Sequence, residues 1–207
     1  MLSVLDLRWA AIILTGGRGA RLGGYQKANL VASDGETTLG RAVAACVGAR
    51  PIVAVGPPTG DAPVIWTRET PAYSGPARGI AAGVTALADS DVSWVAVLAC
   101  DMPQAGPAVP ALLQRARDAD DATDGVVAMS GGHRQWLCAA YRLAPLRAAC
   151  DGLPAGGAGE SVGRLLRGLR LAELIVPESW ATDIDTPADL ARTGFSTTMP
   201  ITEEGCP

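Results

Sequence analysis

The residues with the clearest chemical potential lie in one run near the N-terminus, ILTGGRGARLGGYQKANL, from Ile13 to Leu30. This run places Gly16 and Gly17 directly after an apolar stretch and follows them with Arg21 and Lys27. Glycines allow backbone N–H groups to converge on phosphate oxygens, while Arg and Lys supply positive charge. The run therefore predicts an anion-binding loop, and an ordinary glycine turn with exposed basic residues is the simpler alternative.

Two common phosphate-binding motifs do not fit this loop. A Walker A loop carries Ser or Thr after its lysine for magnesium, whereas Ala28 follows Lys27. A dinucleotide-binding fingerprint needs a third glycine where Leu22 stands. The loop is therefore expected to belong to another class of anion site.

A carboxylate follows another apolar run, in LACDMP, Leu98 to Pro103. Ligands of open α/β sheets bind outside the carboxyl ends of the strands, so Asp101 is expected at the same edge as the glycine loop. A carboxylate there can hold Mg²⁺, with phosphate oxygens and water in the other positions. Capping of the following helix is the alternative role for Asp101, but the nearby anion loop favours magnesium.

The segment ETPAYSGPARGI, Glu69 to Ile80, could contact a flat ligand. Gly75 and Pro76 open an Ala-rich helix, where small residues let such a ligand approach the backbone. Glu69 could accept hydrogen bonds from N–H donors on a nucleobase edge. A solvated loop carboxylate is the competing interpretation.

Two acidic residues near the C-terminus, in DIDTPADL, form a further candidate site. Thr186 and Pro187 indicate a helix start, for which Asp183 and Asp185 are not needed. These two carboxylates could complete a metal site or hold a second substrate. Arg164, at the start of a helix after a glycine-rich connection, could meet an anion.

Composition and charge narrow the class of protein. The 207 residues are 48% hydrophobic but only 4% aromatic, which suits buried parallel strands under small-faced helices. The net charge is −4 and no basic stripe is visible, so we expect no nucleic-acid partner. The five cysteines lack paired spacing, and His133 is the single histidine, which disfavours disulfides, zinc sites and histidine triads. No apolar run is long enough to span a bilayer, and we expect a cytoplasmic protein without membrane contact.

Apolar runs rich in Val and Ile alternate with Ala- and Leu-rich segments along the chain. Strands are expected at 9–14, 52–55, 64–66, 94–99, 126–129, 136–141 and 171–176. Helices are expected at 38–47, 76–87, 107–119, 143–150, 161–169 and 187–192. This alternation predicts one Rossmann-like α/β domain over 1–207, with a three-layer α/β/α core at about 10–192, a mostly parallel sheet and a polar tail at 194–207. Gly131 and Gly132 predict an antiparallel hairpin within the sheet.

The chain resembles the family of molybdenum cofactor guanylyltransferases in five motifs, which occur in the order LTGGRGARLGGYQK, SGPARG, LACDMP, HRQWLCAAYR and DIDTPADL. The resemblance extends from about Ala10 to Arg192. It implies a nucleotidyltransferase fold and the transfer of GMP from GTP to molybdopterin, with release of pyrophosphate. It also implies Mg²⁺ as cofactor, a molybdopterin-type acceptor, and transient contact with cofactor-delivery or apo-enzyme proteins.

The resemblance assigns roles to individual residues of this chain. Arg21, Lys27 and Asp101 become the catalytic residues, with Asp101 on the metal. With the residues already inferred from their chemistry, the expected nucleotide site consists of Leu14, Thr15, Gly16, Gly17, Lys27, Glu69, Gly75, Pro76 and Asp101. From residue chemistry, as above, Asp183, Asp185 and Arg164 are the candidates for contact with the acceptor, and Asp183 and Asp185 could bind the metal instead.

The chain departs from the family's pattern in ways that bear on the nucleotide. The family commonly has Asn at the positions of Asp183 and Asp185, and the Asp form resembles related cytidylyltransferases. The run Thr15 to Gly17 resembles the guanylyl form, and Arg78 replaces a usual apolar residue. GTP is the expected donor. The alternatives are a cytidylyltransferase acting on molybdopterin or another phosphorylated acceptor, and a non-catalytic nucleotide-binding accessory protein.

Overall fold

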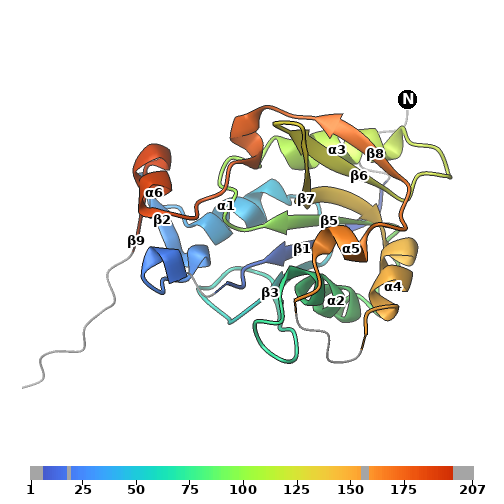
Figure 1. Ribbon diagram of the computed structural model, residues 1–207, viewed down its shortest axis with the longest axis horizontal. Coiled ribbons are helices and arrows are strands. Elements are labelled where there is room, and N and C mark those ends of the chain that lie inside the picture. The colour runs from blue at the N-terminus through green and yellow to red at the C-terminus, as the bar shows by residue number, and fades with distance from the viewer. Residues whose placement is uncertain (1–6, 18–19, 155–158, 198–207) are drawn as a thin grey trace, which may run out of the picture.

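The computed structural model describes residues 7–17, 20–154 and 159–197. A seven-stranded sheet crosses the middle of the molecule with helices on both faces, which gives three layers (Figure 1). The strands lie side by side in the order β4-β3-β1-β5-β7-β6-β8. β7 runs antiparallel to both of its neighbours, and the other pairs are parallel. The expected α/β fold with a mostly parallel sheet is confirmed.

The elements agree closely with those expected from the sequence. The strands of the main sheet are β1 (Trp9–Leu14), β3 (Ile52–Val55), β4 (Ile65–Thr67), β5 (Trp94–Ala99), β6 (Gly125–Ser130), β7 (His133–Arg142) and β8 (Leu171–Ile175). The helices are α1 (Thr38–Ala45), α2 (Pro76–Ala86), α3 (Ala108–Arg117), α4 (Leu143–Asp151), α5 (Val162–Leu165) and α6 (Pro187–Thr193). The helix expected over 161–169 is thus reduced to a single turn, α5.

The two central strands explain why the first two motifs meet. Every residue of β1 and of β5 is buried, as expected of parallel strands that are covered on both faces. The strands are paired in register up to their last residues, Leu14 and Ala99. The glycine loop and Asp101 therefore leave the sheet side by side.

The hairpin expected at Gly131 and Gly132 is confirmed. These glycines have φ of +56° and +77°, and β6 and β7 pair in antiparallel fashion on either side. The register shifts after the pair Val127–Ala139, because Ala128 pairs with Gln135. Residues 136–138 of β7 therefore have no partner on β6, and one of them, Leu137, lines the cavity described below.

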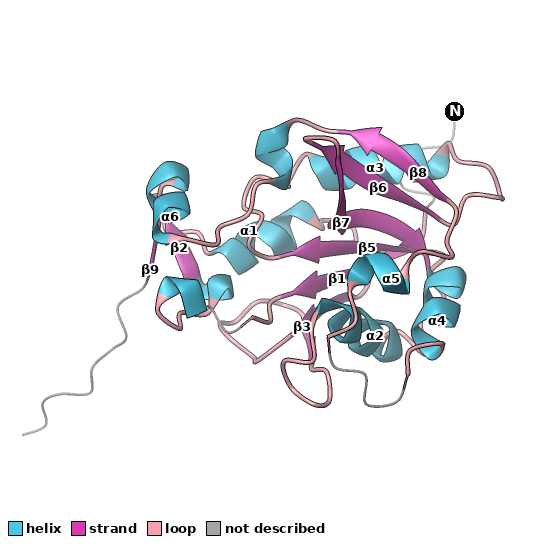
Figure 2. Cartoon of the chain, viewed as in Figure 1, coloured by secondary structure: helices cyan, strands magenta, loops and turns pink. Residues whose placement is uncertain are grey.

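A small second sheet, which the sequence analysis missed, lies beyond the carboxyl edge of the main sheet (Figure 2). It pairs β2 (Leu30–Ala32) with β9 (Phe195–Thr197), close to α6 and to two 3₁₀ turns, η2 (Ala20–Leu22) and η3 (Lys27–Asn29). A third 3₁₀ turn, η4 (Glu178–Ala181), precedes α6. The expected polar tail at 194–207 was therefore wrong at its start, because Phe195 is buried there with Leu30 and Ile184. Residues 198–207 lie outside the described part of the chain.

Helix α2 packs closely against β1 at Gly83. A Cβ at this position would stand 2.6 Å from Cγ2 of Ile12, which is fully buried and cannot move aside. We expect Gly83→Ala to lower the free energy of unfolding by about 1–2 kcal/mol, because overpacking exceeds the roughly 1 kcal/mol that alanine gains over glycine in a helix. Urea denaturation measures the change. Gly106→Ala is the control, since no atom lies within 4 Å of a Cβ there, and equal stability of both variants would contradict the close packing.

Candidate active site

A cavity of about 410 Å³ opens at the carboxyl ends of β1 and β5. This volume falls within the range of small-molecule sites. Most of the candidate nucleotide-binding residues line it, together with one candidate acceptor residue: Leu14, Gly16, Gly17, Lys27, Glu69, Gly75, Pro76, Asp101 and Asp183. Segments far apart in the sequence therefore meet at one site.

A larger hollow of about 880 Å³ lies between α1 and α3. Its walls are mainly apolar, and no residue of the predicted site lines it. The smaller cavity is therefore the candidate active site, because it contains the lysine and the carboxylates that the sequence analysis expected to take part in catalysis.

The glycine loop is held at its start and open toward the cavity. Thr15 donates hydrogen bonds to the carbonyl oxygen of Val55 from both its backbone N–H and its hydroxyl, each at 3.0 Å. Thr15 therefore fixes the loop. No atom lies within 4 Å of the position that a Cβ on Gly17 would take, so a ligand can approach the backbone there. Residues 18 and 19 are not described.

Lys27 joins the two halves of the site. Its ammonium nitrogen Nζ donates to Oδ2 of Asp101 at 2.7 Å and also to Oδ1 of Asp185. The side chains of Lys27 and Asp101 are only 16% and 18% exposed, whereas that of Asp185 is 37% exposed. The ion pair between Lys27 and Asp101 is thus largely shielded from water, and this shielding strengthens the attraction between the two charges.

The protonation state of Lys27 follows from its surroundings. Burial lowers the pKa of the Lys27 ammonium, but hydrogen bonds and charge from Asp101 and Asp185 together raise it by more. The pKa of Lys27 therefore lies above its ordinary value. At neutral pH Lys27 is a fixed positive charge and not a proton acceptor.

Arg21 adds a second cation to the same acidic group. It lies on η2 with a side chain that is 76% exposed, and its Nη1 is 3.3 Å from Oδ2 of Asp185. Asp185 is held from the other side by the capping box of α6, in which Asp189 accepts the N–H groups of Asp185 and Thr186. The helix start expected at Thr186 is thereby confirmed.

A backbone contact fixes the C-terminal acidic segment to the main sheet. The N–H of Ile184 donates to the carbonyl oxygen of Asp101 at 3.0 Å, and the Ile184 side chain is fully buried. Asp183 on one side of Ile184 lines the cavity, and Asp185 on the other side contacts Lys27. Alternation along an extended segment thus brings both carboxylates to the site.

Asp183 is held in an unfavourable environment for a charge. Burial raises the pKa of its carboxyl, and the neighbouring charges of Asp185 and Asp101 raise it further. Because the folded pKa exceeds the unfolded one, the native state binds the proton more tightly, and stability falls as the pH rises through the folded pKa.

We therefore expect Asp183→Asn to stabilise the protein at neutral pH. The gain should stay below about 1 kcal/mol, since the side chain is exposed to screening by solvent. It should vanish below the ordinary carboxyl pKa of 3.8, where Asp183 is neutral in both states. Thermal unfolding at several pH values measures this, with Asp89→Asn at an exposed position as control. A loss of stability at neutral pH would contradict the expectation.

The loop before α2 forms another wall of the cavity. Oε1 of Glu69 accepts the backbone N–H of Tyr73 at 2.8 Å, so one carboxylate oxygen holds its own loop. Gly75, with φ +99°, and Pro76 begin α2. Sequence reasoning missed Tyr73 and Leu137, which also line the cavity. An aromatic residue within a run of small residues was the signal available for Tyr73, whereas Leu137 depends on the bulge in β7.

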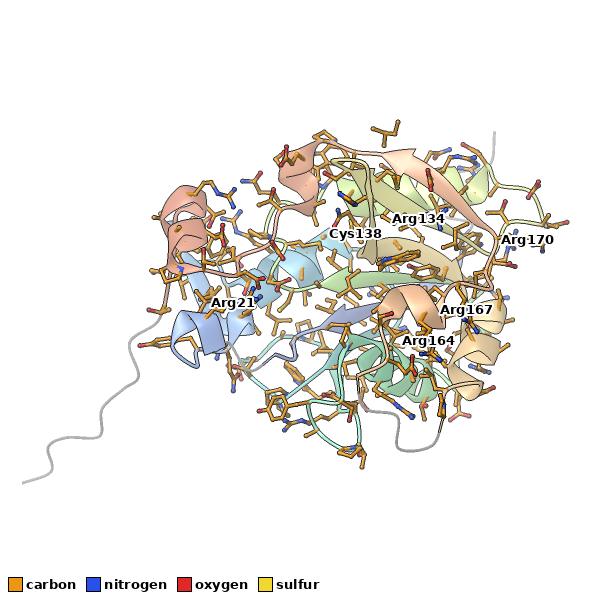
Figure 3. The ribbon with its side chains drawn as sticks, in the orientation of Figure 1. Arg21, Arg134, Cys138, Arg164, Arg167 and Arg170 are labelled. Carbon is orange, nitrogen blue, oxygen red and sulfur yellow. The ribbon has the colours of Figure 1, made fainter. Side chains whose placement is uncertain are left out.

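Arg164 is the predicted site residue that the structure does not bring to the others. It lies on α5, and Figure 3 shows it far from Arg21 across the molecule. Its Nε is 3.3 Å from Oε2 of Glu160, and it does not line the cavity. Its proposed contact with an acceptor stays a prediction.

The mostly parallel sheet, with charged groups gathered at its carboxyl edge, defines an α/β protein of the nucleotidyltransferase fold. Residues 11–172 match the model of the MobA-like NTP transferase domain, and the chain belongs to this family. No curated protein matches the sequence. Among the described residues, no helix is both long and apolar enough to cross a bilayer.

Solved structures show the same fold at low sequence identity. Molybdopterin-guanine dinucleotide biosynthesis protein A from Archaeoglobus fulgidus is 18% identical with a TM-score of 0.67, over 89% of this chain and 96% of that one. The 4-diphosphocytidyl-2C-methyl-D-erythritol synthase of Anaerococcus prevotii is 12% identical with a TM-score of 0.68, over 92% and 96%. The 2-C-methyl-D-erythritol 4-phosphate cytidylyltransferase of Thermus thermophilus is 18% identical with a TM-score of 0.61, over 88% and 96%.

Proposed function

We propose that the protein transfers GMP from GTP to a phosphate of a molybdopterin-type acceptor and releases pyrophosphate. One observation carries the proposal, namely that the glycine loop, the Lys27 ammonium and the Asp101 carboxylate share one cavity. Membership of the family supports nucleotidyl transfer. The name of the Archaeoglobus fulgidus neighbour and the form of the loop from Thr15 to Gly17 support a guanine nucleotide and a molybdopterin acceptor.

In this proposal the triphosphate lies against Gly16 and Gly17, with Lys27 and Arg21 as counter-charges. The base lies toward Gly75 and the loop before α2, where the cavity walls are small or apolar. Asp183 and Asp185 stand at the acceptor side of the site.

The carboxylates fit Mg²⁺ that is carried by the nucleotide. Mg²⁺ is typically bound by one or two protein carboxylates and completes its shell with phosphate oxygens and water. Asp101 offers such an oxygen, and Asp183 lines the same cavity. Within residues 7–17, 20–154 and 159–197, no group of three or more His, Cys, Asp or Glu side chains is arranged to hold a metal. The ion would therefore be held by Asp101 together with phosphates, whose negative charge it would offset.

The protein's own contribution to the reaction is positioning and charge. An acceptor phosphate oxygen attacks the α-phosphorus in line while pyrophosphate leaves, so no side-chain nucleophile is needed. Lys27 keeps its proton and stabilises the growing charge on the phosphate oxygens. The glycine loop orients the chain of phosphates.

We place this reaction in the cytoplasm, because all described cysteines are free thiols. We also propose transient contact with proteins that receive the cofactor.

Mass spectrometry of the products tests the assignment. The protein is incubated with Mg²⁺, molybdopterin and each of the four nucleoside triphosphates in turn, and pyrophosphate is measured in parallel. We expect a GMP adduct of molybdopterin from GTP. A CMP adduct would instead support the cytidylyl alternative, which the acidic pair Asp183 and Asp185 and the two cytidylyltransferases of similar fold favour. Binding of GTP without any pyrophosphate release would support an accessory protein.

A further inference from the structure

Tyr73 has an unusual backbone conformation for its residue type. Its φ of +63° lies in the left-handed region, and no other non-glycine residue of the described chain has a positive φ. A bulky side chain in that region costs free energy that the surrounding contacts must offset. Asn or Gly would adopt the same conformation more readily. The side chain of Tyr73 therefore needs an explanation other than local stability.

The loop is held in this conformation by several contacts. The backbone N–H of Tyr73 donates to Oε1 of Glu69 at 2.8 Å. The guanidinium carbon of Arg68 lies 4.7 Å from the centre of the Tyr73 ring. The next residue, Ser74, donates its hydroxyl to the carbonyl of Pro71 and accepts the N–H of Gly159 at 3.1 Å. The ring of Tyr73 is thus placed on a fixed support.

The ring of Tyr73 is nevertheless not buried in the hydrophobic core. Tyr73 is 49% exposed and lines the same cavity as Gly16 and Asp101. Other residues that line this cavity are apolar or small, among them Leu14, Val55, Gly75 and Pro76. An exposed aromatic face beside such walls is suited to a second flat ring, because aromatic faces stack on nucleobases of any type.

We propose that Tyr73 stacks on the nucleobase of the bound nucleoside triphosphate, and that Glu69 is a positioning residue that fixes Tyr73 through its backbone. The inference rests on the proposed function only in that the cavity binds a nucleoside triphosphate. It extends that function by naming the residue that recognises the base by its face. Glu69 then acts on the nucleotide through the loop and not through the base edge.

The test compares variants that separate the ring from the backbone strain. Tyr73→Gly and Tyr73→Asn remove the ring but suit a positive φ, so their unfolding midpoints should equal or exceed that of the wild type. The Kd for GTP should rise about tenfold in both variants, on the scale of losing one base–aromatic stack. Tyr73→Phe should keep most of the affinity because it keeps the ring. Inorganic tripolyphosphate has no base, so its Kd should not change in any of the three variants.

Several results would overturn the proposal. One is wild-type affinity for GTP in Tyr73→Gly and Tyr73→Asn. Another is an equal loss of affinity for GTP and for tripolyphosphate in these variants. A wild type that binds no nucleoside triphosphate would also remove it, whereas one that binds GTP without turnover would refute only the transferase function.

The role of Glu69 is tested separately. Glu69→Ala should weaken GTP binding while tripolyphosphate binding stays the same, and Glu69→Gln should restore GTP binding, because its amide oxygen can still accept the Tyr73 N–H. Glu69→Ala in the Tyr73→Gly background should cause little further loss of GTP affinity, since a positioning residue has nothing left to position. A full further loss would show direct contact between Glu69 and the base.

Discussion

Replacing Lys27 by alanine is expected to lower the turnover number for pyrophosphate release by about 10²- to 10³-fold, the scale for losing one preorganised electrostatic partner. Lys27 is the shielded cation of the site, and its raised pKa keeps it charged at neutral pH. The variant also removes the positive charge that lies between Asp101 and Asp185. The two uncompensated carboxylates would then repel an incoming triphosphate. The measurement is pyrophosphate release from GTP with saturating acceptor.

Arg8→Ala is the matched control for that experiment. Arg8 also forms an ion pair, with Asp91, but both side chains are well exposed and lie at the amino end of β1, opposite to the cavity. An exposed pair of this kind contributes little to stability. Turnover of Arg8→Ala should stay near that of the wild type. Near-normal turnover of Lys27→Ala would refute the assignment of Lys27.

The Asp101→Asn variant should show a loss of similar size, about 10²- to 10³-fold in turnover. The substitution keeps the shape of the side chain and leaves the backbone carbonyl that accepts the N–H of Ile184. The fold is therefore expected to persist. Only the charge that faces Lys27, and that would face Mg²⁺, is removed.

The magnesium dependence of that variant gives a second readout. If Asp101 holds Mg²⁺ with the triphosphate, the magnesium concentration for half-maximal rate should rise in Asp101→Asn along with the loss of turnover. Asp61→Asn, at an exposed turn, is the control and should change neither quantity. A normal magnesium requirement in Asp101→Asn would argue that Asp101 only orients Lys27.

The central strands of the main sheet could be predicted because they are buried on both faces. Runs such as Trp94–Ala99 are apolar without interruption, and this pattern needs no tertiary information. The small sheet could not be predicted in the same way. β2 and β9 are three residues each, and Leu30 and Phe195 are buried only because distant segments fold over them.

The candidate site likewise has a part with a local sequence signal and a part that depends on contacts between distant residues. The meeting of the glycine loop, Lys27 and Asp101 at one cavity was predictable, because glycines, a lysine and a carboxylate that follow buried strands stand out by residue type alone. The contact between Lys27 and Asp185 spans 158 positions of sequence and had no local signal. Tyr73 was missed because the features that single it out, its backbone angle and its place in the cavity wall, are not visible in a sequence.

The candidate site combines residues from two distant parts of the chain, the glycine loop near the N-terminus and the segment around Ile184. The match to the family model ends at residue 172, and the segment that carries Asp183 and Asp185 comes later in the chain. It is joined to the loop after β5 by the hydrogen bond from Ile184 to Asp101, and to Lys27 and Arg21 through Asp185. The acidic wall of the candidate site therefore comes from a segment outside the residues that match the family model, whereas the glycine loop lies within them.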